Sequence, residues 1–101
     1  MPAPFRVSYS AAMLAEVKRL FIRAREVGLD KEFLAALAKV HDALEQQPLD
    51  FGDPAFGLHF AKIRIRHEIV RPILVYWGVH EESSTVYLKS IELWPGLPEA
   101  S

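Results

Sequence analysis

The chain has 101 residues, half of them apolar, with a formal net charge of −1, and this length suffices for one hydrophobic core in a single domain over residues 1–101. The sequence contains no cysteine, which excludes disulfides, thiolate catalysis and thiolate metal sites, and the small net charge excludes a global positive field that attracts polyanions. No apolar run approaches the ~20 residues that span a bilayer, and the start MPAPFRVSYS lacks the pattern of a signal peptide, so we expect a cytoplasmic protein.

The first half of the chain predicts a short strand followed by two helices. Residues 5–9 alternate apolar and polar side chains, which is typical of a strand. Ser10 can cap a first helix, whose apolar residues recur at helical spacing until Gly28 ends it. Asp30 can cap a second helix that should end near Gln47. Because so few residues separate the two helices, they should form a helical hairpin.

The second half of the chain changes to a period of two residues, which indicates strands. Residues 48–58 contain two prolines and two glycines, and we expect a loop there. Strands are predicted over residues 62–69, 73–79 and 85–93. Turns are expected at residues 71–72 and 81–84.

The element order is therefore β-α-α-β-β-β. A sheet must cover its apolar face, and the helical hairpin is the only cover that the chain offers. We expect a two-layer α+β fold in which an antiparallel sheet packs on the helical hairpin. The strand over residues 73–79 should be central, with Trp77 in the core.

The strand over residues 62–69 carries three cations at strict two-residue spacing. Lys62, Arg64 and Arg66 should project together into solvent, while the isoleucines between them project to the face that the helices cover. Cations ~6–7 Å apart match the phosphates of an extended nucleic acid, and arginine can bind phosphate with two hydrogen bonds. The alternative is a solvated strand face whose charge discourages aggregation. His67 shares the parity of the isoleucines and should be buried and hydrogen-bonded.

Residues 5–94 contain, in order, the strand FRVSY, the helical hairpin, the loop element FGDP, the charged strand KIRIRHEIV and the strands PILVYWGV and VYLKSIEL. This order and these motifs resemble the RelE/ParE toxin superfamily, the small toxins of bacterial toxin–antitoxin and plasmid-stabilisation systems. The resemblance implies the same α+β fold and an antitoxin protein as partner. It implies no metal and no other cofactor.

The nuclease branch of that superfamily cleaves messenger RNA on the ribosome, where the ribose 2′-hydroxyl attacks the adjacent phosphate. This chemistry needs cations to stabilise the phosphorane and groups that transfer protons. The resemblance therefore implies Arg64, Arg66 and His80 as catalytic residues, with His80 as the acid or base because its ordinary pKa is ~6.5. RNA binding would fall to Lys62, Arg64, Arg66, Tyr76, Tyr87 and Lys89.

Two departures from the nuclease branch favour an alternative. Active members usually carry a further arginine on the third strand and a tyrosine or histidine near the C-terminus, and both places are apolar here. Family toxins are also commonly basic, whereas this chain is slightly acidic. The alternative is a non-catalytic ParE-like or silent protein that acts through protein–protein contacts with gyrase or an antitoxin. The sequence leaves both functions open, and it leaves self-association open as well.

Overall fold

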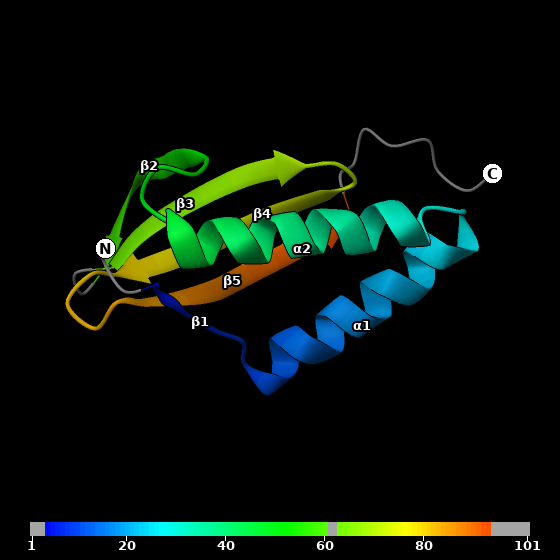
Figure 1. Cartoon of the computed structure of the whole chain (residues 1–101), viewed down its shortest axis with the longest axis horizontal. Coiled ribbons are helices and arrows are strands. Elements are labelled where there is room, and N and C mark those ends of the chain that lie inside the picture. The colour runs from blue at the N-terminus through cyan, green and yellow to red at the C-terminus, as the bar shows by residue number, and fades with distance from the viewer. Residues whose placement is uncertain (1–3, 61–62, 94–101) are drawn as a thin grey trace.

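The structure, a computed structural model, describes residues 4–60 and 63–93, with the backbone alone described for residues 56–60 (Figure 1). The elements are β1 (Arg6–Ser8), α1 (Ala11–Glu26), α2 (Asp30–Gln46), β2 (Asp53–Phe60), β3 (Ile63–Val70), β4 (Ile73–His80) and β5 (Thr85–Leu93). The chain is a small α+β domain in which two helices pack on a five-stranded mixed sheet. The predicted α+β class and the two-layer arrangement are confirmed.

Local signals in the sequence set the ends of the helices. Ser10 Oγ accepts a hydrogen bond from the Met13 N–H at 3.0 Å, which caps α1 as predicted. Gly28 follows α1 with a φ of +78°, a conformation that glycine adopts without a steric penalty. The predicted cap of α2 is wrong, because the N-cap is Leu29, which makes no side-chain cap bond. Asp30 instead lies in the first turn, where its negative charge interacts favourably with the positive end of the helix dipole.

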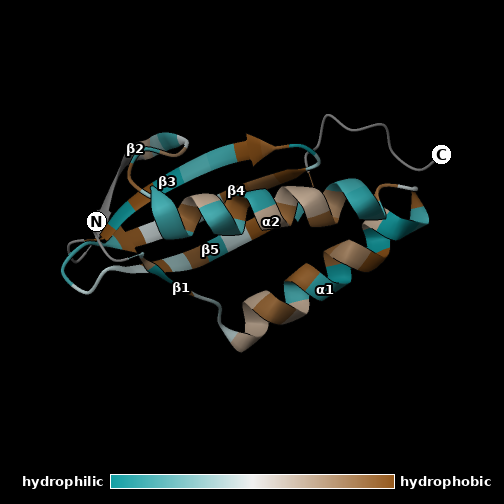
Figure 2. Ribbon diagram, in the orientation of Figure 1, coloured by the Kyte–Doolittle hydropathy of each residue, from teal (hydrophilic) through white to brown (hydrophobic). Residues whose placement is uncertain are grey.

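Both helices are amphipathic, and each buries one stripe of side chains. Figure 2 shows hydrophobic and hydrophilic segments alternating along α1 and α2, as expected for helices that cover a sheet. Within the described residues, neither helix combines the length and the apolar character needed to cross a membrane.

The sheet has the strand order β1-β5-β4-β3-β2, so β4 is central as predicted. β1 runs parallel to β5, and the other neighbouring strands pair antiparallel. The prediction of a purely antiparallel sheet is therefore wrong. β1 and β5 are joined by the whole intervening chain rather than by a tight turn, and such a connection permits parallel pairing.

The predicted loop over residues 48–58 contains a fifth strand. β2 pairs with β3 near both of its ends, and its register shifts between Pro54 and His59. Pro54 lies in an edge strand, where its missing N–H removes no ladder bond from the interior of the sheet. The prolines and glycines of this segment therefore mark an irregular edge strand as well as a loop.

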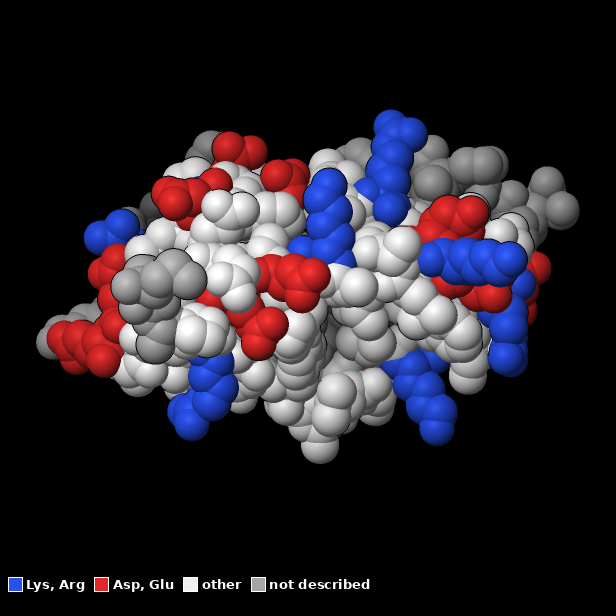
Figure 3. Space-filling view, in the orientation of Figure 1, with Lys and Arg blue, Asp and Glu red and all other residues white. Residues whose placement is uncertain are grey.

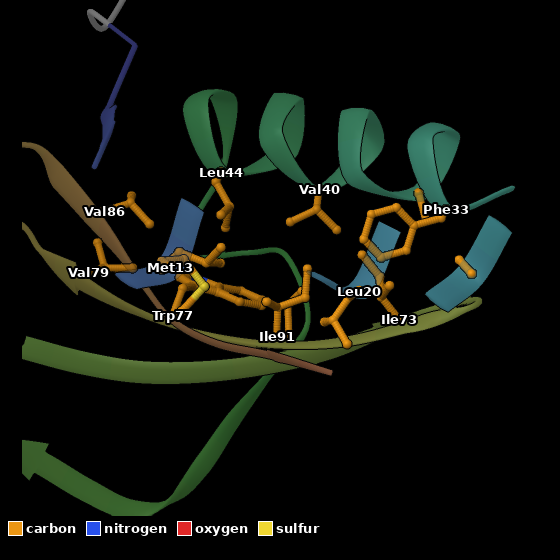
Figure 4. Close-up of a cluster of buried hydrophobic side chains, with 14 residues drawn as sticks. Met13, Leu20, Phe33, Val40, Leu44, Ile73, Trp77, Val79, Val86 and Ile91 are labelled. Carbon is orange, nitrogen blue, oxygen red and sulfur yellow. The ribbon is translucent and has the colours of Figure 1, made fainter. Parts of the chain in front are cut away.

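The core lies between the helices and the central strands (Figure 4). Its largest fully buried apolar side chains include Phe33, Val40, Leu44, Ile73, Val75, Trp77, Val79 and Val86. Trp77 stacks on Phe51, with ring centroids 5.3 Å apart. Its indole N–H donates to the Pro48 carbonyl at 3.2 Å. The predicted core position of Trp77 is confirmed.

Candidate binding surface

The pairing of β3 with β4 decides which way the basic strand faces. Arg64 is paired with Val79, and Arg66 is paired with Trp77. Directly paired residues of neighbouring strands project to the same face, and Val79 and Trp77 belong to the core under the helices. Both arginines therefore project to the helix-covered side, and the predicted orientation is wrong. Lys62, the third cation of the row, lies outside the described residues.

Arg66 fixes a neighbouring segment of the chain. Its Nε donates to the Phe51 carbonyl at 3.0 Å, and its Nη2 donates to the Gly52 carbonyl at 2.7 Å. Gly52 has a φ of +69°, and a Cβ at this position would clash with the carbonyl oxygen of His67 and lie 2.8 Å from Trp77 Cη2. The guanidinium group of Arg66 thus holds a tightly packed turn against the sheet.

The three predicted catalytic residues do not meet. Arg64 is largely exposed on the helix-covered side, with Nη2 4.0 Å from Glu81 Oε2. His80 projects from the opposite face of β4. Its Nδ1 lies 2.7 Å from Ser83 Oγ and accepts a hydrogen bond from the Ser83 N–H at 3.2 Å. His80 therefore fixes the turn between β4 and β5, on the other side of the sheet from Arg64 and Arg66.

A groove on the helix-covered side lies between α2 and the end of β3. Glu32 and Lys39 line it from α2, Glu68 and Arg71 line it from the β3 end, and Phe51 lies between them. The two acids offset the two cations, so the groove has no net positive charge. Figure 3, seen from the same side as Figure 1, shows acidic and basic side chains interspersed over this surface. We find no continuous basic surface in this view.

Within residues 4–60 and 63–93, no helix covers the opposite side of the sheet, and we call this side the open face. It comprises the described residues of β3, β4 and β5 that project away from the helices: Ile63, Ile65, His67, Ile69, Leu74, Tyr76, Gly78, His80, Thr85, Tyr87, Lys89, Ser90 and Glu92. Most of these side chains are apolar or aromatic. Among them, Lys89 and Glu92 are the residues that carry a permanent charge.

Two aromatic contacts lie on the open face. Tyr76 and His67 are direct partners across β4 and β3, with ring centroids 5.3 Å apart. Lys89 Nζ lies 5.8 Å from the ring centroid of Tyr87. His67 has the predicted parity, but the prediction of burial is wrong because it is half-buried on the open face. Tyr76, Tyr87 and Lys89, three of the predicted RNA-binding residues, therefore share one face with His67.

Gly78 explains why this part of the open face is closely packed. A Cβ at Gly78 would lie 2.6 Å from Ile63 Cγ2, 3.2 Å from Ile65 Cδ1 and 3.3 Å from Lys89 Cε. The two isoleucines and the aliphatic part of the lysine thus occupy the space that the glycine leaves. The contact also fixes independently which face the isoleucines share.

A side-chain cluster that was not predicted from the sequence joins Tyr9, just after β1, to His41 and Glu45 on α2. The Tyr9 hydroxyl lies 2.6 Å from His41 Nδ1 with the two rings stacked, and His41 Nε2 lies 3.4 Å from Glu45 Oε1. Burial, and then the charge of Glu45, raise the pKa of Tyr9. The hydrogen bond between Tyr9 and His41 ties the chain after β1 to α2. The spacing of His41 and Glu45 could have revealed one half of the cluster, but no local signal connects it to Tyr9.

Comparison with known proteins assigns no family to the chain, because no family model, curated protein or solved structure matches it. The resemblance to the RelE/ParE superfamily stays a prediction that rests on element order and short motifs. The part of the chain that the structure describes also holds no group of three histidine or acidic side chains that could bind a metal ion.

Proposed function

We propose that this chain is a non-catalytic binding protein that acts through protein–protein contacts made by the open face. This is the second of the two functions expected from the sequence. The observation that carries the proposal is the register of β3 on β4. This register directs Arg64 and Arg66 to the helix-covered side, while isoleucine and tyrosine side chains project from the uncovered side.

The charges of the open face support a protein partner over a nucleic acid. A protein that binds nucleic acid neutralises several phosphates with lysine and arginine side chains on one surface. Among the described residues of the sheet that project to this side, the cations are Lys89 and Arg6, which β1 pairs with Thr85, and they are offset by Glu92 and by Asp53, which β2 pairs with His67. Aromatic and aliphatic side chains with few charges are instead typical of the centre of a protein interface.

The positions of the predicted catalytic residues support binding without catalysis. A general acid or base must lie within hydrogen-bonding reach of the group that it serves. A phosphate held by Arg64 would lie on the helix-covered side, whereas His80 projects from the open face. Two of the five N–H donors of Arg66 are bonded to backbone carbonyls, which directs its guanidinium group toward the turn at residues 51–52. If the RelE/ParE resemblance holds, an antitoxin or gyrase is the kind of protein that the open face would contact.

Photo-cross-linking in bacterial cells tests this proposal. A photoreactive benzoylphenylalanine replaces Tyr87, which is 37% exposed on the open face, and Leu34, which is 52% exposed on α2, serves as the matched control. We expect irradiation to give protein adducts from position 87 and none from position 34. RNA adducts from position 87, or new cuts within translated codons after induction of the unmodified chain, would contradict the proposal.

A further inference from the structure

We infer that the protein that covers the open face is a second copy of this chain, in a symmetric dimer whose two open faces pack on each other. This inference rests on the proposed function, because it names the partner of the same surface. Its support comes from the charge and the exposed side chains of the open face, and the size of this face sets the affinity that we expect.

The charge distribution allows the open face to pack on itself. In a two-fold interface the same patch of both copies is buried, so any excess of one charge on the patch is doubled. Lys89 and Glu92 on the open face, together with Arg6 and Asp53 that flank it on β1 and β2, give two permanent charges of each sign, so the patch has no excess to double. The net charge of the whole chain is −1, which leaves little long-range repulsion between copies.

The size of the open face predicts a weak dimer. β3 and β4 have eight residues each, and β5 has nine. With strands ~4.8 Å apart and a rise of ~3.3 Å per residue, the three strands cover roughly 15 by 27 Å. This planar footprint of ~400 Å² places the face toward the low end of interface sizes, since each partner of a standard interface buries ~800 Å² of accessible surface. We therefore expect a dissociation constant on the order of 10 to 100 µM.

The exposed apolar residues identify the contacts that a second copy would bury. Ile69 is 40% exposed and Tyr87 is 37% exposed, on the two strands that flank β4. Leu74 and Tyr76 lie half-buried on β4 between those strands. Ile69 is the direct partner of Leu74, Tyr76 follows on the same face of β4, and Tyr87 is paired with Gly78, the next open-face residue of β4. Sheets that pack face to face bury such side chains by interdigitating them. Aromatic and branched apolar anchors of this kind supply most of the binding energy in interfaces.

Sedimentation equilibrium of the purified chain, from about 1 to 500 µM, tests the inference across the expected range of dissociation constants. The open-face variants are Ile69→Glu and Tyr87→Glu. The controls are Leu14→Glu and Leu34→Glu, which place the same charge at residues of α1 and α2 that are 56% and 52% exposed. We expect a reversible monomer–dimer equilibrium whose dissociation constant rises at least ~10-fold in each open-face variant and stays within ~2-fold in the controls.

A second measurement locates the interface and does not depend on stability. The natural chain has no cysteine, so Ile69→Cys and Leu34→Cys each introduce a single thiol. A short bismaleimide should link two copies through position 69 and not through position 34. Circular dichroism of every variant verifies that the fold is retained, which the exposure of all four sites leads us to expect.

The outcomes separate this inference from the proposed function. A chain that stays monomeric up to 500 µM overturns the dimer, and so does a dimer that Leu34→Glu dissociates while Ile69→Glu does not. If the monomeric chain still gives adducts with another protein from position 87, the dimer falls and the proposed function stands. If position 87 gives RNA adducts instead, both fall.

Discussion

The two faces of the sheet differ in what their side chains already contact within the chain. On the helix-covered side, Trp77 and its neighbours at alternate positions of β4 are fully buried, and Arg66 is bonded to two carbonyls of an adjacent turn. On the open face, Tyr76 and Ile69 retain accessible surface. Arg66 of the basic strand thus packs within the fold, whereas the open face keeps apolar side chains that are partly exposed.

The largest expected contrast is between two adjacent residues of β4. Trp77→Ala removes a fully buried ring, its stacking on Phe51 and its bond to the Pro48 carbonyl, so we expect the free energy of unfolding to fall by ~3–5 kcal/mol. Tyr76→Ala removes a half-buried ring from the open face and should cost ~1 kcal/mol. Urea unfolding measures both. Equal losses would show that the two faces are equally packed.

A second contrast concerns two glycines with positive φ. Gly28 has nothing within 4 Å of an added Cβ, so Gly28→Ala should cost only the strain of the left-handed conformation, ~1–2 kcal/mol. Gly52→Ala adds a clash with the His67 carbonyl and with Trp77, and we expect a total of ~2–4 kcal/mol. Thermal unfolding of both variants measures the difference. A smaller loss for Gly52→Ala than for Gly28→Ala would mean that the turn does not pack on the sheet.

The two arginines provide a third contrast. Arg66→Gln breaks two charge-assisted bonds to backbone carbonyls and should lower the free energy of unfolding by ~1–3 kcal/mol. Arg64 is 60% exposed and lies 4.0 Å from an exposed Glu81, so Arg64→Gln should change it by less than ~0.5 kcal/mol. Chemical denaturation is the measurement. If Arg64→Gln is the more damaging variant, Arg66 does not hold the turn.

The smallest expected effect is a dependence on alkaline pH. Burial, and then Glu45, raise the pKa of Tyr9 above its ordinary value of 10.0. Its neutral form is therefore favoured by folding, so its contribution to stability is complete below pH ~10 and is lost as the pH rises through the folded-state pKa. Between about pH 8 and pH 11.5, the wild type should lose more stability than Tyr9→Phe, which cannot ionise at this position. Identical pH profiles would contradict the assignment.

Much of the fold could be predicted from local signals. Ser10 and Gly28 mark the ends of α1 because caps depend on side chains within one turn. β4 and β5 follow from their β-branched and aromatic residues. β2 was not predicted because proline and glycine near its start, Pro54 and Gly52, are typical of turns. Its pairing with β3 at the edge of the sheet is a long-range contact that the local sequence does not reveal.

The direction of the basic row could not be read from alternation, because alternation gives two faces without saying which one is covered. The isoleucines of β3 look like core residues, yet they lie on the open face. The tight turn over residues 71–72 could have decided the question. It places Val70 opposite Ile73, and counting back along both strands places Arg66 opposite Trp77. A core tryptophan thus directs the arginine to the helix-covered side.

The orientation of the β3 isoleucines can be measured by nuclear Overhauser spectroscopy on a sample with labelled isoleucine methyl groups. The register of β3 on β4 predicts contacts from Ile65 Cδ1 to Gly78 and to the side chain of Lys89, with no contact to the indole of Trp77. Cross-peaks between the Ile65 methyl groups and the Trp77 indole would contradict it. The arginines would then project from the uncovered face, and the surface proposed here for protein binding would not exist.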